Sequence, residues 1–327
     1  MLGTIVKIFK ILRYLLLLSL CLANTVVAKQ LSFAKQLQGD HYLFNYEWLD
    51  HNDVPQAIHF SLTKHALFQR FRLLRGYQND FAQKTIMRAV KQQLRDSPLQ
   101  GAQAFFFQKN GRMTMQVKGL EDKNVALAYQ KVKKIEKTAT EQYFKKNYFQ
   151  FFRTPEHVSG VKIDHVRIAN DAVVDFKTIK PVILAQVSIK NIREVTDYVL
   201  SFVQSIPYST LESRITSSGT GFNSPATLLW ENQGDCDSKM TLTATILRAL
   251  MPRIDMAMVY IDQHAFIGIA TPAKAGEMTI EYQGVRYLLG EPTGPAPYKL
   301  GKLAPESELA INQGRYVAEA FHSDDRF

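Results

Sequence analysis

The spacing of apolar residues predicts a mixture of strands and helices in the first half of the chain. Period-two alternation predicts strands, recurrence every three to four residues predicts helices, and an Asn-Gly pair between two alternating runs predicts a hairpin turn. In chain order these signals predict strands at 42–48 and 58–62, a helix at 79–95, a hairpin over 104–117 with its turn at Asn110-Gly111, a long helix at 122–150 and two further strands within 158–177.

The second half of the chain has clearer helical periods, each with signals at its ends. Asn191, with Glu194 three residues later, precedes an apolar stripe that stops at Pro207, so a capped helix is expected between them. Asp235 precedes a second stripe that ends at Pro252. The remaining signals predict a surface loop rich in Ser, Thr and Gly at 209–227 and four strands at 256–261, 264–270, 278–282 and 285–290.

Length and pattern together favour two domains of the α+β class. About 299 residues remain when 1–28 are set aside, which exceeds what one hydrophobic core usually holds. Arg153-Thr154-Pro155 marks a break between the two halves. We therefore expect a separate α+β N-terminal domain at 29–155, linking strands at 156–185 and a second domain at 186–327.

The first 28 residues have the composition of a secretory signal peptide. Lys7, Lys10 and Arg13 form a basic start, a leucine-rich run follows over 14–23, and small residues precede an expected cut after Ala28. The apolar run is shorter than the roughly 20 residues that a membrane-spanning helix needs. We therefore expect the processed chain to be periplasmic or secreted.

Lysines are concentrated, among aromatic residues, in the predicted helix at 122–150. Removing 1–28, which holds three positive and no negative residues, lowers the formal net charge from +10 to +7. Val132, Ile135 and Ala139 recur at helical spacing, which favours a solvated helix face over a nucleic-acid interface. An anionic envelope surface is the partner that this charge would suit.

Cys236 is the only cysteine left once 1–28 are removed, because Cys21 lies in that segment. It therefore cannot form an internal disulfide, although exported proteins usually meet conditions in which disulfides form. Cys236 stands in the first helical turn after Asp235, where free amide groups and the helix dipole favour a thiolate nucleophile. Asp235 and Asp237 oppose that charge, so a basic partner is required. A buried apolar cysteine is the alternative interpretation.

His264 is the best candidate for the basic partner, because it stands at the mouth of a predicted strand and can face the helix end. Glu291 follows the last predicted strand and is the candidate acid that orients the imidazole. In a simple meander the strands of His264 and Glu291 would be parallel, which would hold the two residues roughly 20 Å apart. A triad therefore requires the last strand to lie beside the histidine strand, antiparallel to it, with the Gln283-Gly284 hairpin displaced to the sheet edge.

Three separated motifs resemble those of the transglutaminase-like cysteine hydrolases of the papain-like fold class: Gly-Asp-Cys-Asp-Ser at 234–238, His-Ala at 264–265 and Glu-Pro-Thr at 291–293. Residues 202–208 are also similar to the helix that precedes the cysteine motif in this family, and the resemblance covers roughly 186–303. It implies an α+β core with a nucleophile helix packed on an antiparallel sheet. It further implies Cys236 as nucleophile, His264 as general base and acid, and Glu291 at a position where the family most often has aspartate.

The implied chemistry is attack of Cys236 on an amide or ester carbonyl to give a thioacyl-enzyme, which water or an amine then resolves with help from His264. This describes an exported hydrolase or acyltransferase with a peptide or protein substrate. The Cys236 amide would hold the oxyanion with one further donor, for which the candidates are Gln233, Trp230 and Thr293; a packing role for Trp230 is the alternative.

No cofactor or metal is expected, because Asp235 and Asp237 flank the thiol without a histidine at ligand spacing. Two other functions are consistent with the same residues. One is a catalytically silent module that keeps the fold and binds an envelope protein or polymer. The other makes the N-terminal half the functional part, docked through its basic helix on anionic envelope polymers.

Overall fold

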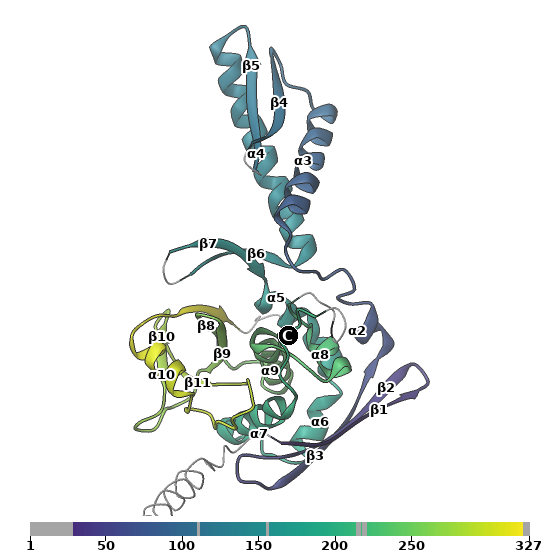
Figure 1. Ribbon diagram of the computed structural model, residues 1–327, viewed down its shortest axis with the longest axis vertical. Coiled ribbons are helices and arrows are strands. Elements are labelled where there is room, and N and C mark those ends of the chain that lie inside the picture. Colours follow the sequence, from purple (N-terminus) through teal and green to yellow (C-terminus); the bar gives the residue numbers. More distant parts are fainter. Residues whose placement is uncertain (1–28, 110–111, 155–156, 214–216, 218–220, 323–327) are drawn as a thin grey trace, which may run out of the picture.

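The chain forms mixed α+β structure with several antiparallel sheets, arranged as a body and a projecting arm (Figure 1). The computed structural model describes residues 29–109, 112–154, 157–213, 217 and 221–322. The expected signal peptide at 1–28 and the turn at Asn110-Gly111 lie outside these ranges. Within them, every helix is too short or too polar to cross a lipid bilayer.

A five-stranded antiparallel sheet forms one side of the body, in the order β10-β11-β9-β8-β12. Its strands are β8 (Met256–Ile261), β9 (His264–Ile269), β10 (Thr279–Tyr282), β11 (Val285–Gly290) and β12 (Val317–Phe321). The four strands predicted here are confirmed. The β10–β11 hairpin is displaced so that β11, not β10, pairs with β9 and runs antiparallel to it. This is the strand order that a His264–Glu291 contact requires.

The helix α9 (Cys236–Leu250) packs against this sheet, and α7 (Ile192–Ser205) and α8 (Pro225–Glu231) pack against α9. The predicted caps are confirmed, since the Asn191 side chain accepts from the Glu194 amide and Asp235 accepts from the Ser238 amide. The predicted loop at 209–227 is wrong at its end, because α8 begins at Pro225. Ser224 caps α8, and proline is favoured in a first helical turn, where its missing N–H costs nothing.

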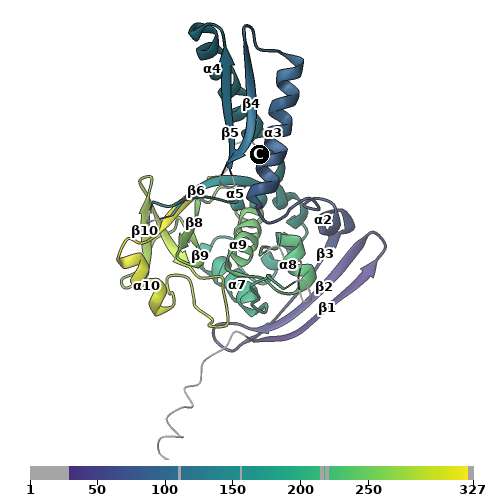
Figure 2. The same cartoon turned by 45° about the horizontal axis from the view of Figure 1, so that its top comes forward.

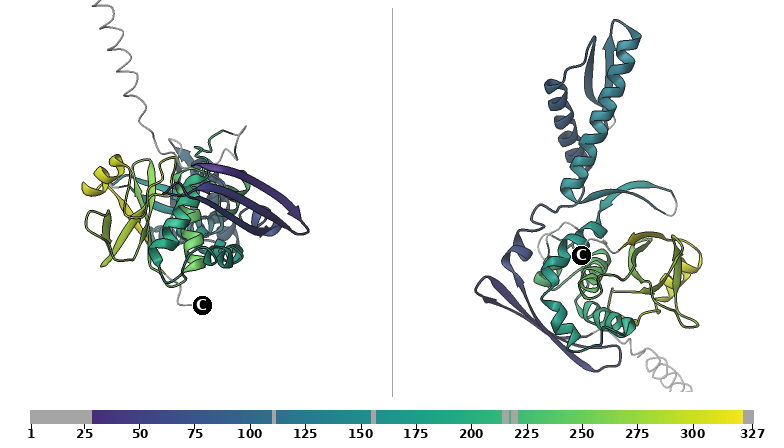
Figure 3. Two further views of the ribbon diagram at one scale, coloured as in Figure 1. Left: turned by 90° about the horizontal axis from the view of Figure 1, so that it is seen from below. Right: turned by 180° about the vertical axis from the view of Figure 1, so that it is seen from behind.

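A three-stranded antiparallel sheet covers the other side of the helices, as Figure 3 shows. It consists of β1 (Gln30–Gln38), β2 (His41–Leu49) and β3 (Pro55–Thr63), and α2 (Lys64–Phe68) follows. The strands predicted at 42–48 and 58–62 are confirmed as β2 and β3, which pair with each other. β1 was not predicted: Leu31, Phe33 and Leu37 stand at alternate positions, but Lys35 interrupts them and almost all side chains of the strand are exposed.

The three-stranded sheet belongs to the body and not to a separate N-terminal domain. Trp48 and Tyr46 are fully buried in one apolar core that also holds residues of α7, α8, α9, β8 and β9. The Trp48 indole donates to Ser201 Oγ on α7 at 3.1 Å, and the Tyr46 and Phe202 rings lie 5.0 Å apart. The expected division at 155 is therefore wrong for residues 30–63, because the aromatic face of these strands is buried only against the helices.

Trp48→Phe should lower the free energy of unfolding by about 1–2 kcal/mol, since it leaves the buried Ser201 hydroxyl without its donor and removes part of the ring. Urea denaturation followed by circular dichroism measures this change. A double-mutant cycle that combines this change with Ser201→Ala should give a coupling free energy of about 1 kcal/mol between the two side chains, and the chain should unfold in a single transition. Two transitions, with only one shifted by the substitution, would restore a separate N-terminal domain.

The arm, residues 79–147, consists of α3 (Asn79–Asp96), β4 (Ala102–Lys109), β5 (Arg112–Gly119) and α4 (Asp122–Asn147), and Figure 2 shows it projecting from the body. Both helices and the hairpin were predicted. The long helix ends at Asn147 because Tyr148 adopts a left-handed conformation (φ 56°). β4 and β5 pair only with each other, and α3 and α4 pack on one face of the hairpin.

The linking segment is more helical than expected. β6 (Phe149–Arg153) and β7 (Ser159–Ile163) form an antiparallel pair, but α5 (His165–Ala172), the 3-10 helix η1 (Val173–Phe176) and α6 (Ile179–Leu184) follow. The predicted second strand within 158–177 and the linking strands at 156–185 are therefore wrong beyond Ile163. The Asp164 side chain caps α5 by accepting the Arg167 amide, and Ile168, Ala172 and Phe176 are buried at helical spacing. Another short helix, α10 (Pro305–Asn312), precedes β12.

Candidate active site

The turn before α9 holds Cys236 beside the end of α7. Gly234 donates its N–H to the Pro207 carbonyl and accepts the Ser209 N–H, each at 3.2 Å. A Cβ at Gly234 would lie 2.6 Å from Leu228 Cδ1, so a larger residue here would force the buried Leu228 side chain to move. Both backbone groups of Gly234 therefore tie the turn to the segment that follows α7, and Cys236 begins the helix after this turn.

His264 and Glu291 are brought together by the pairing of β9 with β11. His264 Nε2 lies 2.8 Å from Glu291 Oε1, and the ring packs edge-on against Phe266 at 4.8 Å between centroids. With Nε2 donating to the carboxylate, Nδ1 is left as the acceptor nitrogen. The carboxylate thus selects the tautomer in which Nδ1 can take a proton.

Glu291 is held from both sides. Its Oε2 accepts the Ala304 N–H at 2.8 Å, and its backbone carbonyl accepts Nε2 of Gln204 at 2.7 Å. Gln204 lies on α7 and is buried, with its Oε1 2.8 Å from His51 Nε2. Sequence reasoning missed Gln204, although a buried amide within the apolar stripe of α7 is the kind of signal that could have identified it.

Cys236, His264 and Glu291 line one cavity of about 380 Å³, together with Tyr208, Tyr298 and other residues of the 293–304 segment. Tyr208 follows the end of α7 and forms an isolated backbone bridge with Gly234. The three predicted catalytic residues therefore share a solvent-accessible space. Its volume suits a side chain and the reacting bond of a substrate rather than a whole drug-sized ligand.

The thiol of Cys236 is neutral in this geometry. Burial raises its pKa to about 12, and the charges of Asp237 and Asp235 add to this effect against the backbone amides of the helix end. Sγ lies 3.8 Å from the Gln263 carbonyl oxygen, and no hydrogen bond joins it to His264 among the described residues. The expected resting thiolate is thus not favoured here, because two carboxylates and burial outweigh the helix dipole.

The three candidates for an oxyanion donor have different positions. Thr293 lines the cavity, and its Oγ1 is buried without a hydrogen-bond partner in the described structure. Gln233 and Trp230 are not among the residues that line this cavity. Trp230 instead packs edge-on against Tyr42 and Phe68, with Lys35 Nζ 3.6 Å from its ring centroid. These contacts are those of a packing residue, which was the alternative interpretation of Trp230.

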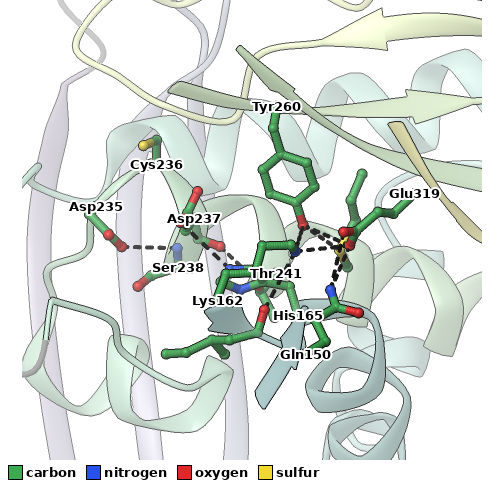
Figure 4. A network of polar contacts seen from close by, with 12 residues as sticks. Gln150, Lys162, His165, Asp235, Cys236, Asp237, Ser238, Thr241, Tyr260 and Glu319 are labelled. Atoms are coloured by element: carbon green, nitrogen blue, oxygen red, sulfur yellow. Dashed lines mark hydrogen bonds and ion pairs between the residues drawn. The ribbon is translucent and has the colours of Figure 1, made fainter. Parts of the chain in front are cut away.

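A polar network lies on the other side of the first turn of α9, away from the Cys236 sulfur (Figure 4). Asp237 Oδ2 lies 3.5 Å from His165 Nε2 on α5, and burial lowers the pKa of His165 well below its usual value, so this contact is not a charged pair. Lys162 of β7 pairs with Glu319 of β12 at 2.9 Å. The network fixes the linking strands β6 and β7 against the body and holds Asp237 near the thiol.

Within the described ranges, no cluster of three or more His, Cys, Asp or Glu side chains is arranged to hold a metal ion. Comparisons with known proteins give no further guidance: no family model matches the chain, and searches of curated proteins and of solved structures found no match.

Proposed function

We propose that this chain is an exported thiol hydrolase or acyltransferase that cleaves or transfers a peptide or protein amide through a thioacyl-enzyme, on a transglutaminase-like core. The observation that carries the proposal is the short His264–Glu291 contact in the same cavity as Cys236, a thiol at the start of a helix. The strand order β10-β11-β9 is a second support, since a simple meander would have separated these groups.

In the proposed reaction the thiol is deprotonated as it attacks. Cys236 Sγ forms a bond to the substrate carbonyl carbon, its proton passes to His264 Nδ1, and the carbonyl electron pair moves to oxygen. Collapse expels the amine, which takes the proton from the imidazolium that Glu291 stabilises. Water or a second amine then attacks the thioester with His264 again as base, which releases the acid or the transferred product.

A second candidate is a catalytically silent module of the same fold that binds an envelope protein or polymer. The elevated pKa of Cys236, about 12, and the approach of its sulfur to the Gln263 carbonyl favour it. A neutral thiol without a hydrogen bond to an imidazole is a poor nucleophile. The two candidates differ in whether His264 activates Cys236.

Alkylation of Cys236 by iodoacetamide across pH separates them. If His264 takes the thiol proton, the rate constant at pH 7 should exceed that of His264→Ala by at least about tenfold. In the variant the rate should rise only with the high pKa of the isolated thiol. Mass spectrometry of the labelled chain measures both profiles.

His59→Ala is the matched control, because this exposed histidine lies on β3 and bonds only Asn45 among the described contacts. Its profile should match the wild type. Identical profiles in all three proteins, each rising steeply only above about pH 9, would reject the hydrolase in favour of the binding module.

A further inference from the structure

The arm carries the whole charge excess of the chain. Residues 79–147 hold 14 Lys and Arg against six Asp and Glu, a net charge of +8, whereas residues 29–327 together carry +7. The body is therefore close to neutral. Charge confined to a projecting element attracts an anionic partner to that element and not to the cavity of Cys236.

A groove of about 1120 Å³ lies between the second half of α3, the following loop and β4. Leu94, Leu99, Phe106 and Leu120 supply apolar surface. Lys91, Arg95 and Lys118 line the same groove, and none of the residues that line it is acidic. The groove thus combines apolar surface with three positive charges.

The inward face of the hairpin is incompletely covered by the helices. Ala104, Phe106, Met113, Met115 and Val117 point toward α3 and α4 at alternate positions, yet each is only half-buried. Inward residues of a sheet packed on helices are usually fully buried. Ala104 and Phe106 also line the groove, so added apolar side chains would extend the packing of this face at these two residues.

The outer edge of β4 is free to pair. β4 and β5 form a two-stranded sheet, and in the described structure no backbone hydrogen bond joins the edge of β4 opposite β5. On the β5 edge, by contrast, the Met113 amide bonds Gln83 of α3 at 2.7 Å. The groove is lined by β4 from Ala102 to Phe106, so a strand paired with this part of β4 would lie in it.

We propose that this groove binds an extended, acidic segment of a partner protein, which adds to β4 as a third strand. Backbone hydrogen bonds to β4 supply affinity, as in other cases of strand addition. Alternate apolar side chains pack on Leu94, Leu99 and Phe106, and the intervening carboxylates lie on the opposite face, where Lys118 projects beside Phe105. Lys91, beside Phe106, and Arg95 border the apolar face and add to the positive charge that attracts the segment. A concave site between a helix and a strand suits a peptide, whereas a membrane surface would meet a flat or convex face.

Fluorescence anisotropy with a labelled peptide of alternating Glu and Val, nine residues long, tests the proposal on the full-length processed chain. We expect saturable binding that weakens as salt is raised. A peptide of alternating Lys and Val, and the Glu-Val peptide N-methylated at alternate residues, should each bind at least about tenfold more weakly, because one loses the charge match and the other the backbone donors.

Two double variants of equal charge change locate the site. Lys91→Glu with Lys118→Glu should weaken binding at least about tenfold, whereas Lys134→Glu with Lys137→Glu, both exposed on α4 outside the groove, should change it less than about twofold. Thermal melting by circular dichroism checks that both variants are folded.

Three results would overturn the proposal. Equal weakening by the two double variants, or equal binding of a peptide with the same residues in separate Glu and Val blocks, would reduce the interaction to general charge attraction. Sedimentation of the chain with phosphatidylglycerol vesicles, undiminished by excess Glu-Val peptide and without binding of that peptide alone, would assign the arm to a lipid surface. None of these measurements depends on Cys236, so they stand apart from tests of the hydrolase.

Discussion

Replacing Cys236 by alanine is expected to abolish turnover of p-nitrophenyl acetate, an activated ester that a thiol nucleophile can cleave, and His264→Ala is expected to lower it by about 10³–10⁴-fold. The first loss follows because no thioacyl intermediate can form. The second is the effect of removing a general base from a thiol whose pKa is raised to about 12, since almost none of it is ionised at pH 7 without proton transfer to His264.

Glu291→Gln should give an intermediate loss of about 10–100-fold, because the amide can still bond the ring but cannot stabilise its positive charge. The bond from Ala304 to the side chain and the contact of Gln204 with the backbone remain available in this variant. His322→Ala, an exposed histidine near Asp255, is the control and should keep full turnover. Turnover that persists in Cys236→Ala would show that the cleavage does not use this thiol.

Replacing Lys239 by methionine is expected to stabilise the chain strongly at neutral pH. Lys239 lies one turn after Cys236 and is fully buried, and its ammonium group donates to the Ile206 carbonyl. Burial lowers its pKa to about 7 from an ordinary value of 10.5. A long apolar side chain of similar shape would fill the same space without this titration.

The sign of the pH dependence follows from these two pKa values. Between about pH 7 and pH 10.5 the unfolded chain binds the Lys239 proton and the folded chain does not, so the wild type gains stability as the pH rises. The advantage of Lys239→Met over the wild type should therefore grow on going from pH 10 to pH 7, by roughly 3–4 kcal/mol, and stay constant below pH 7. Urea denaturation at pH 7 and pH 10 measures it.

Lys177→Met, at an exposed lysine, is the control, and its effect on the free energy of unfolding should be the same at both pH values. If Lys239→Met behaved in the same way as this control, the Lys239 ammonium would be hydrated in the folded chain. The difference in strength between the ammonium and the neutral amine as donors to Ile206 is already contained in the folded pKa of Lys239, so it does not disturb the comparison.

Local signals in the sequence were sufficient for most of the elements around the candidate site. Asp235 and Asn191 cap the helices that follow them, and the apolar runs at 256–261 and 285–290 form strands at those positions. Caps and apolar periods act within one turn or one strand, so they can be recognised without knowing the rest of the fold. β1 was missed because almost all its side chains are exposed, and α8 was misassigned despite the start signals of Ser224 and Pro225, because the residues before it are rich in Ser, Thr and Gly.

Taken alone, the sequence determined that Cys236 begins a helix, that His264 begins a strand and that Glu291 follows one. Only the tertiary structure decided that β11 lies beside β9, that Gln204 and Ala304 hold Glu291, and that burial, with Asp237, keeps the thiol neutral. Strand order depends on contacts between residues far apart in the chain, and a pKa depends on burial and on every charge nearby. Neither quantity is contained in any short stretch of residues.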